Sequence, residues 1–162
     1  GETSVGVNPV NVIENMTNII KGVEDSPLIK VPLAPPHIKT VRYISKAICH
    51  HAALMSNDID AKAISTLTNS GYTAFQISAW RPKSYVFAFT SNRRILTMLN
   101  LLWGVKTFYY NNLVNTDTTV REINKIAREM GYLKKGDYVI NLTSMPVKEK
   151  GMVNTMRVTE LK

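Results

Sequence analysis

The sequence predicts a three-layer α/β/α fold, in which helices cover both faces of a mostly parallel sheet of about five strands. From residue 61 onward, short β-rich runs alternate with helical segments. The connections between them are short, which is typical of right-handed strand–helix–strand units. The last two strands are joined by a segment without a helical pattern. We therefore expect the final strand to be antiparallel, at an edge of the sheet or beside the fourth strand.

The first helix is expected over residues 8–24, where apolar residues recur at helical spacing. Asn8 can accept hydrogen bonds from the first amide groups, and Pro9 suits the first helical turn. The apolar stripe is wide, so this helix needs cover on more than one side. Residues 25–37 hold four prolines and are expected to form an extended linker or hinge.

The remaining elements are expected to form one α/β domain over residues 38–162, which begins with a helix at 38–56. The first strands end in polar turns rich in Thr, Ser and Asn, which can cap the helices that follow. Strands are expected at 61–67, 85–89, 105–110, 137–142 and 154–159, and further helices at 72–80, 93–102 and 118–130. Residues 1–24 precede this domain and its linker.

Length and composition fit a globular chain without disulfides. The chain has 162 residues, of which 44% are hydrophobic, enough for one domain with its own core. Its one cysteine, Cys49, excludes a disulfide framework within the chain and suits a reducing, cytoplasmic location. No apolar run approaches a membrane span, and the first residues lack the pattern of a secretory signal. The first residue is not Met, and we expect a piece of a longer polypeptide.

The net charge of +8 is unevenly distributed. Residues 61–116 contain no Asp or Glu, and such a stretch creates a positive field that attracts phosphates, nucleotides or nucleic acid. The alternative is a basic surface that keeps the protein in solution. The basic residues of this stretch are Lys62, Arg81, Lys83, Arg93, Arg94 and Lys106.

The strongest candidate site is the turn at 68–73, where a strand ends and a helix begins. Backbone amides at a helix N-terminus, with hydroxyl groups beside them, can bind an anion such as phosphate. Gly71 lets the backbone close around the ligand. The alternative is an ordinary helix cap, which uses the same residue types. The candidate phosphate-binding residues of this turn are Thr68, Asn69, Ser70, Gly71 and Thr73.

Two further segments are expected at the same edge of the sheet. Residues 90–94 also follow a strand, but an ordinary cap with a solvated basic turn is favoured there. The loop at 145–151 carries Lys148 and Lys150, which could reach an anion at this edge; a plain surface loop is the alternative. The cluster Cys49-His50-His51 lies within a helix, so its side chains point to different sides and no metal site is predicted. No pattern of catalytic residues is present.

Five motifs in order resemble the pyruvate kinase family. The opening Gly-Glu-Thr-Ser-Val-Gly-Val-Asn-Pro resembles the family's segment that leads into the last helix of the catalytic barrel. The likeness covers essentially the whole chain and implies the C-terminal regulatory domain, preceded by that helix at 1–24. The other motifs are Thr68-Asn69-Ser70-Gly71-Tyr72-Thr73 followed by Arg81-Pro82, then Thr90-Ser91-Asn92, Leu102-Trp103-Gly104-Val105, and Gly151 to Val158.

The resemblance implies a parent enzyme that transfers the phosphoryl group of phosphoenolpyruvate to ADP, giving pyruvate and ATP in glycolysis. This reaction uses Mg²⁺ and usually K⁺, and the family carries it out in the barrel and beneath a lid domain, which this chain lacks. We therefore expect no cofactor and no catalytic residue here, with Glu2 only at the rim of the active site. The fragment alone is expected to be inactive.

The resemblance also implies assembly and regulation. The family's C-terminal domain packs subunits into a tetramer, and in many members it binds a phosphorylated effector at a loop that matches the turn at 68–73. Tyr72 stands where bisphosphate-regulated relatives often carry a basic residue, and Met145 and Val147 do not supply the Trp/Arg pair of some animal forms. A sugar monophosphate or a nucleotide is therefore favoured, with Lys148 or Lys150 as a substitute cation.

Two alternatives stay open at this point. One is a structural domain that mediates subunit contacts and binds no effector. The other is a basic nucleic-acid-binding module, which is less favoured because the basic residues are not interleaved with stacking aromatic residues. Because the apolar stripe of the first helix is expected to lack its barrel, we expect the chain by itself to form a dimer, to swap this helix or to dock it on its own domain.

Overall fold

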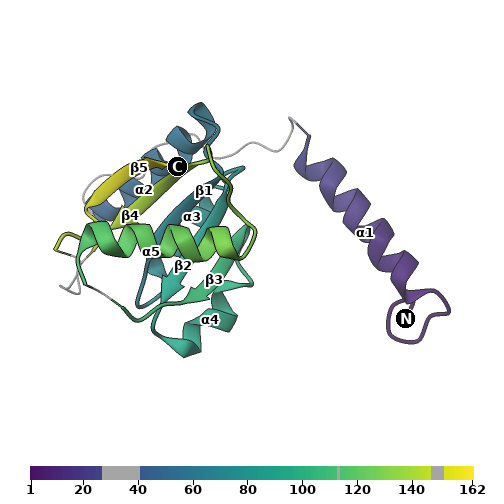
Figure 1. Ribbon diagram of the computed structural model, residues 1–162. Helices are drawn as coiled ribbons and strands as arrows, with labels where there is room; N and C mark the ends of the chain where they lie inside the picture. The colour runs from purple at the N-terminus through teal and green to yellow at the C-terminus, as the bar shows by residue number, and fades with distance from the viewer. Residues whose placement is uncertain (27–40, 113, 147–151) are drawn as a thin grey trace. The chain divides into compact units, whose positions relative to one another are not determined.

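The computed structural model describes residues 1–26, 41–112, 114–146 and 152–162 (Figure 1). It divides into two units, Gly1–Pro32 and Leu33–Lys162. The expected linker at 25–37 lies outside the described residues from position 27 onward. The linker and the domain boundaries predicted from the sequence therefore stay predictions.

The first unit contains one helix, α1, at Pro9–Glu24 in the described residues. Pro9 occupies its first turn as expected, whereas the side chain of Asn8 makes no capping hydrogen bond within the described part of this unit. The amide of Asp25 closes the helix by donating to the carbonyl of Lys21 at 3.0 Å. All residues of its apolar stripe are at least half exposed, from Met16 at 50% to Val10 at 69%; the stripe consists of Val10, Ile13, Met16, Ile19, Ile20 and Val23. The described part of the unit therefore does not cover the stripe.

The second unit contains a five-stranded sheet in the order β3-β2-β1-β4-β5 (Figure 1). Neighbouring strands among the first four are parallel, and β5 is antiparallel to β4 at the edge. Both features confirm the prediction. The strands are β1 at Ala63–Leu67, β2 at Tyr85–Thr90, β3 at Val105–Tyr109, β4 at Tyr138–Thr143 and β5 at Thr155–Glu160.

Two cores lie on the two faces of this sheet, because successive strand residues point to opposite sides. One core contains Ile64, Val86 and Ile140 and packs against three helices. The other contains Ala63 and Phe87, which lie under a single helix together with other aromatic residues. The first face is covered by α2 at Tyr43–Asp58, α3 at Tyr72–Ala79 and α4 at Arg93–Leu99, and the second by α5 at Thr116–Glu129. This is the predicted α/β/α arrangement.

The helix ends differ by a few residues from the expected ones, because side chains and tight turns fix them. The carboxamide oxygen of Asn115 accepts the amide of Thr118 at 2.9 Å, so α5 begins at Thr116, before the expected residue 118. The amide of Leu102 donates to the carbonyl of Leu99 at 3.1 Å, a tight bond that ends α4 early. The helix expected from 38 begins at Tyr43 in the described residues.

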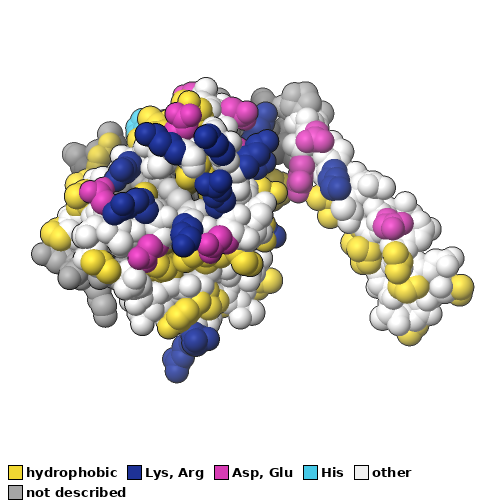
Figure 2. Space-filling model, viewed as in Figure 1, with side chains coloured by type: hydrophobic (Ala, Val, Ile, Leu, Met, Phe, Trp, Pro, Cys, Tyr) yellow, Lys and Arg dark blue, Asp and Glu magenta, His cyan; other side chains and the backbone are white. Residues whose placement is uncertain are grey.

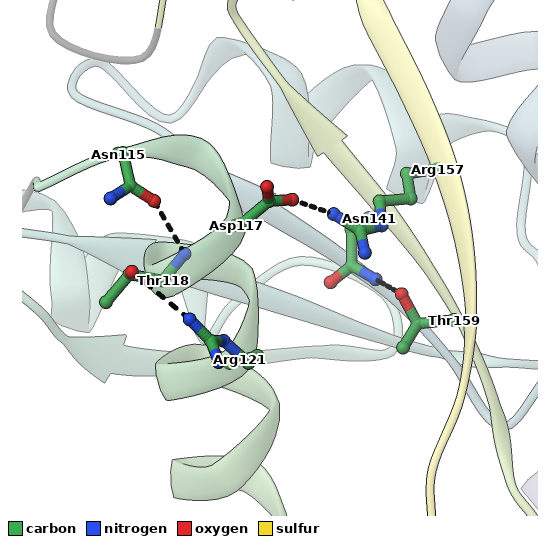
Figure 3. A network of polar contacts seen from close by, with 7 residues as sticks. All are labelled: Asn115, Asp117, Thr118, Arg121, Asn141, Arg157 and Thr159. Carbon is green, nitrogen blue, oxygen red and sulfur yellow. Dashed lines mark hydrogen bonds and ion pairs between the residues drawn. The ribbon is translucent and has the colours of Figure 1, made fainter.

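A polar network attaches the edge strand β5 to its neighbours (Figure 3). Arg157 on β5 forms an ion pair with Asp117 in the first turn of α5. The carboxamide of Asn141 on β4 donates to the hydroxyl of Thr159 on β5 at 3.1 Å. The last strand is therefore fixed by side chains as well as by its backbone ladder with β4.

Candidate functional site

The loops that follow β1, β2 and β4 meet at one edge of the sheet. Leu67 pairs with Phe89 of β2, and Thr66 pairs with Leu142 of β4. The last residues of these three parallel strands therefore lie side by side. We call this edge the carboxyl end; ligands of open α/β sheets usually bind there.

The turn at 68–73 joins β1 to α3 and is held by its own hydroxyl groups. The amide of Gly71 donates to the hydroxyl of Thr68 at 2.9 Å, and the amide of Tyr72 donates to the hydroxyl of Ser70 at 3.5 Å. The amide of Thr68 donates to the carbonyl of Phe89 at 2.9 Å, which attaches the turn to β2. Two of the predicted hydroxyl groups thus accept hydrogen bonds within the turn itself, and neither of them caps α3.

The first turn of α3 still has amide groups to offer. Phe75 donates its amide to the carbonyl of Gly71 at 3.0 Å, but the amides of Thr73 and Ala74 have no acceptor among the described residues. Such unpaired donors, together with the helix dipole, attract an anion. Ser70 is exposed, whereas Thr73 is buried at 8% exposure. An anion would therefore approach from the Ser70 side of the turn.

Gly71 is the residue that shapes this turn. Its φ of 82° lies in the left-handed region, which favours glycine. A Cβ atom at this position would lie 2.8 Å from Cδ2 of Leu99, the last residue of α4. A side chain at this position would therefore need the positive φ and a shift of the Leu99 side chain, which favours glycine at the centre of the candidate site.

Asn92 connects the turn at 68–73 to the neighbouring turn after β2. Its side-chain amide donates to the carbonyl of Asn69 at 3.2 Å, and its carboxamide oxygen accepts the amide of Arg94 at 3.1 Å. The second bond is the helix cap that was favoured for this turn. The first bond was not expected, and it couples the position of the 68–73 turn to the start of α4.

Arg42 is a functional candidate that the sequence analysis missed. Its guanidinium carbon lies 4.3 Å from the centre of the Tyr72 ring, a distance typical of a cation–π contact. Arg42 directly precedes α2, so the whole of α2 and β1 lies between it and Tyr72 in the sequence. The helix expected from residue 38 placed it within a helix and gave no signal for this contact. It brings a positive charge to a turn in which Tyr72 supplies none.

The base of the third loop is held by Asn154. Its carboxamide oxygen accepts the amide of Met145 at 2.8 Å, and its side-chain amide donates to the carbonyl of Met145 at 2.9 Å. This pair of bonds joins the end of β4 to the approach of β5 at the carboxyl end. The predicted Lys148 and Lys150 lie outside the described residues. Their part in the site stays a prediction.

The other predicted positions lie away from this turn or carry no site. Glu2 is exposed in the first unit, and its carboxylate lies 3.6 Å from the N-terminal ammonium group. Burial raises the pKa of the Cys49 thiol to about 12, so this thiol stays protonated at neutral pH. His50 is buried and His51 exposed, as expected for adjacent helical residues.

The described residues contain no group of three or more His, Cys, Asp or Glu side chains arranged to hold a metal ion. Within the same residues, no helix is both long and apolar enough to cross a bilayer.

Comparison with known families decides where this fold belongs. The family described as "Pyruvate kinase, alpha/beta domain" matches residues 46–159, which include β1 to β4, all of β5 except Glu160, and all but the first turn of α2. The chain belongs to this family. The pyruvate kinase resemblance drawn from the 68–73 turn and the closing strand is thereby confirmed.

Individual pyruvate kinases extend the likeness beyond this domain. The chain is 29% identical over 160 residues to a protein named pyruvate kinase from Lactobacillus delbrueckii subsp. bulgaricus, covering 98% of this chain and 27% of the relative. It is 30% identical over 158 residues to a pyruvate kinase from Mycobacterium intracellulare, covering 98% and 33%. It is 32% identical over 158 residues to one from Geobacillus stearothermophilus, covering 98% and 27%. The chain thus spans about a quarter to a third of the length of these relatives.

Proposed function

We propose that this chain is the effector-binding and subunit-contact domain of a pyruvate kinase, preceded by the last helix of the catalytic barrel. The parent would transfer the phosphoryl group of phosphoenolpyruvate to ADP in the cytoplasm. The observation that carries the effector role is the turn at 68–73, which follows a buried strand in a domain of this family. It presents two amide groups without an acceptor among the described residues, and hydroxyl groups beside them.

The proposed ligand is a metabolite with one phosphate group, such as a sugar phosphate or a nucleotide. The amides of Thr73 and Ala74 would donate to the phosphate oxygens, and the hydroxyl of Ser70 would turn from the amide of Tyr72 toward the ligand. That bond is long at 3.5 Å, so little is lost when it breaks. Arg42, 4.3 Å from the Tyr72 ring, supports the proposal because it supplies charge beside the turn.

The proposed regulation follows from the bond between Asn92 and the carbonyl of Asn69. A phosphate that shifts the turn would also shift the start of α4, because Asn92 caps that helix. An effector with different affinity for two arrangements of the domain would then bias the parent enzyme by linkage, and couplings of about 1–3 kcal/mol are typical.

The chain alone is proposed to be inactive. Phosphoryl transfer needs cations positioned around the reacting phosphate, and in the parent these, with Mg²⁺ and K⁺, would belong to the remaining two thirds or more of the relatives' length. The exposed stripe of α1, which includes Ile13 and Ile19, would pack against that missing part. The parent is proposed to be a tetramer.

The effector role is tested by calorimetric titration of the chain with AMP, glucose 6-phosphate and fructose 1,6-bisphosphate. We expect saturable binding of a monophosphate, weakened by Ser70→Ala and by Arg42→Gln. Each change removes a hydrogen bond or a charge contact to a charged group, worth about 1.5–3 kcal/mol, which corresponds to roughly a tenfold to hundredfold loss in affinity.

Ser91→Ala is the matched control, because it removes an exposed hydroxyl from the neighbouring strand-end turn. Its affinity should equal that of the unmodified chain. Equal affinities for Ser70→Ala, Arg42→Gln and Ser91→Ala would remove the ligand from this turn.

One observation favours the second candidate, a structural domain without an effector. The hydroxyl of Thr68 accepts the amide of Gly71 at 2.9 Å, a good hydrogen bond that an anion would have to replace or leave in place. If no phosphorylated metabolite binds at millimolar concentration, the subunit-contact role is the one that stands.

A further inference from the structure

A cavity of about 570 Å³ lies where the parallel strands begin, at the opposite end of these strands from the turn at 68–73. It is formed where three loops enter strands: the loop from α2 into β1, the loop from α3 into β2, and the loop from α5 into β4. We call this edge the amino end. The volume falls within the range of small-molecule sites in proteins. Figure 2 shows basic side chains gathered over the upper part of the visible face of this domain.

The rim of this cavity is held by hydrogen bonds between the three loops. Lys62 donates its amide to the carbonyl of Tyr138 at 2.9 Å, and its own carbonyl accepts the amide of Tyr85 at 3.1 Å. The buried hydroxyl of Ser84 donates to the carbonyl of Ala61 at 2.6 Å. Because each loop is attached to another by its backbone, the side chains that line the cavity start from fixed positions.

Three lysines, Lys62, Lys83 and Lys134, line the cavity, one from each loop. None of them forms an ion pair in the part of the chain that the structure describes, although Asp60 and Asp137 line the same cavity. The ammonium group of Lys62 instead lies 5.7 Å from the centre of the Tyr85 ring. Three lysines without an ion-pair partner among the described residues, lining one hollow from separate loops, form a place where a multiply charged anion can be held.

The two carboxylates narrow the class of ligand. Asp137 already accepts the amide of Lys134 at 2.8 Å, which leaves further lone pairs on its carboxylate. A carboxylate repels an anion but accepts a hydrogen bond from a hydroxyl group. The lining therefore fits a molecule with a phosphate at one end and hydroxyl groups at the other better than it fits a bare anion.

We propose that the amino-end cavity is a second ligand site, which takes a phosphorylated sugar. The ammonium groups of Lys62, Lys83 and Lys134 hold the phosphate, and Asp60 and Asp137 accept hydrogen bonds from the sugar hydroxyls. The site shares no residue with the turn at 68–73 and does not depend on the function proposed for that turn.

The test is a titration of the ¹⁵N-labelled 162-residue chain with ribose 5-phosphate, followed by amide NMR shifts. We expect saturable shifts at Lys62, Ser84 and Lys134. Lys83→Met and Lys134→Met should each weaken binding at least fivefold. Lys106→Met is the matched control, since it removes an exposed lysine of the same acid-free stretch from β3 and should leave these shifts unchanged.

Each arm of this titration decides one part of the proposal. Shifts confined to residues 68–73 would overturn the amino-end site. Shifts confined to the amino end would support it and show that ribose 5-phosphate does not bind the turn at 68–73. Ribose alone should bind far more weakly than ribose 5-phosphate. If inorganic phosphate binds the amino end as tightly as ribose 5-phosphate, the role of the two aspartates is wrong, and equal losses in Lys83→Met and Lys106→Met would overturn the site.

Discussion

The two ends of the parallel sheet offer anions different chemistry. At the carboxyl end, the turn at 68–73 presents backbone amides and short hydroxyl side chains, and a glycine with a positive φ fixes its shape. At the amino end, three lysines line a cavity whose rim is held by backbone hydrogen bonds. The recognition proposed for the first end would therefore depend on backbone geometry, and that proposed for the second end on charge.

The largest effect should come from Gly71→Ala, which should lower stability and abolish binding at the carboxyl end only. The substitution forces a side chain into the left-handed region and places Cβ 2.8 Å from Leu99. We expect a loss of about 1–2 kcal/mol in the free energy of unfolding, from the backbone conformation alone, with the contact to Leu99 adding to it. Urea unfolding of the two proteins measures this difference, and binding at the 68–73 turn should be lost with it.

The matched control for this prediction is Gly136→Ala. Gly136 has a similar φ of 87°, but no atom lies within 4 Å of the position of its Cβ. Gly136→Ala should therefore lose only the stability that the left-handed backbone conformation costs, without a clash like that with Leu99. Equal losses of stability in the two variants would mean that packing against Leu99 does not shape the turn.

A smaller effect is expected from Asn154→Ala, which removes both hydrogen bonds to the backbone of Met145. These bonds are exposed, so we expect a loss of about 1 kcal/mol in the free energy of unfolding. Asn154→Asp is the control, because it keeps the acceptor for the amide of Met145 and loses only the donor. Urea unfolding should rank the unmodified chain first, Asn154→Asp second and Asn154→Ala last. The opposite order of the two variants would contradict this role.

The sequence predicted the fold well because its signals are local. Alternating strands and helices with short connections predict a parallel sheet, and the helix-free connection before β5 predicts an antiparallel last strand. Local side chains then decide the helix ends, as Asn115 does for α5. The 68–73 turn was predicted for the same reason, since its hydroxyl groups and Gly71 are contiguous in the chain.

The rest could not be predicted because it depends on residues that only the fold brings together. Arg42 and Tyr72 are distant in sequence and meet because α2 packs beside α3. Lys62, Lys83 and Lys134 lie in three separate loops and converge because β1 is flanked by β2 and β4. Two of these lysines, Lys62 and Lys83, belong to the acid-free stretch, which is a weak signal, and no pattern in the sequence indicates their common cavity.

The smallest expected effect is a pH dependence of the free energy of unfolding that arises from His50 on α2. The buried ring of His50 on α2 lies 4.2 Å from the ring of Trp80, which follows α3, and neither of its nitrogens has a partner among the described residues. Burial, and secondarily the charge of His51, lower the pKa of His50 below its usual value of 6.5. The folded state therefore prefers the neutral ring, and protonation favours unfolding.

The contribution of His50 to stability is therefore complete above about pH 6.5 and is lost as the pH falls below the unfolded-state pKa toward the lower folded-state pKa. Urea unfolding at pH 8, 7, 6 and 5 should show this loss in the unmodified chain and a smaller loss in His50→Gln. His51→Gln is the control and should keep most of the loss, because burial is the larger cause. A pH dependence that is the same in all three proteins would contradict the prediction.

The strand order also has a consequence for how this chain is made. The first strand of this sheet in chain order, β1, lies at its centre, where Ala63 pairs with Tyr85 on one side and with Val139 on the other. The second partner is synthesised only after three more helices. Since non-local pairing slows folding and leaves strand edges open in the meantime, we expect the nascent domain to be most prone to aggregation before β4 arrives.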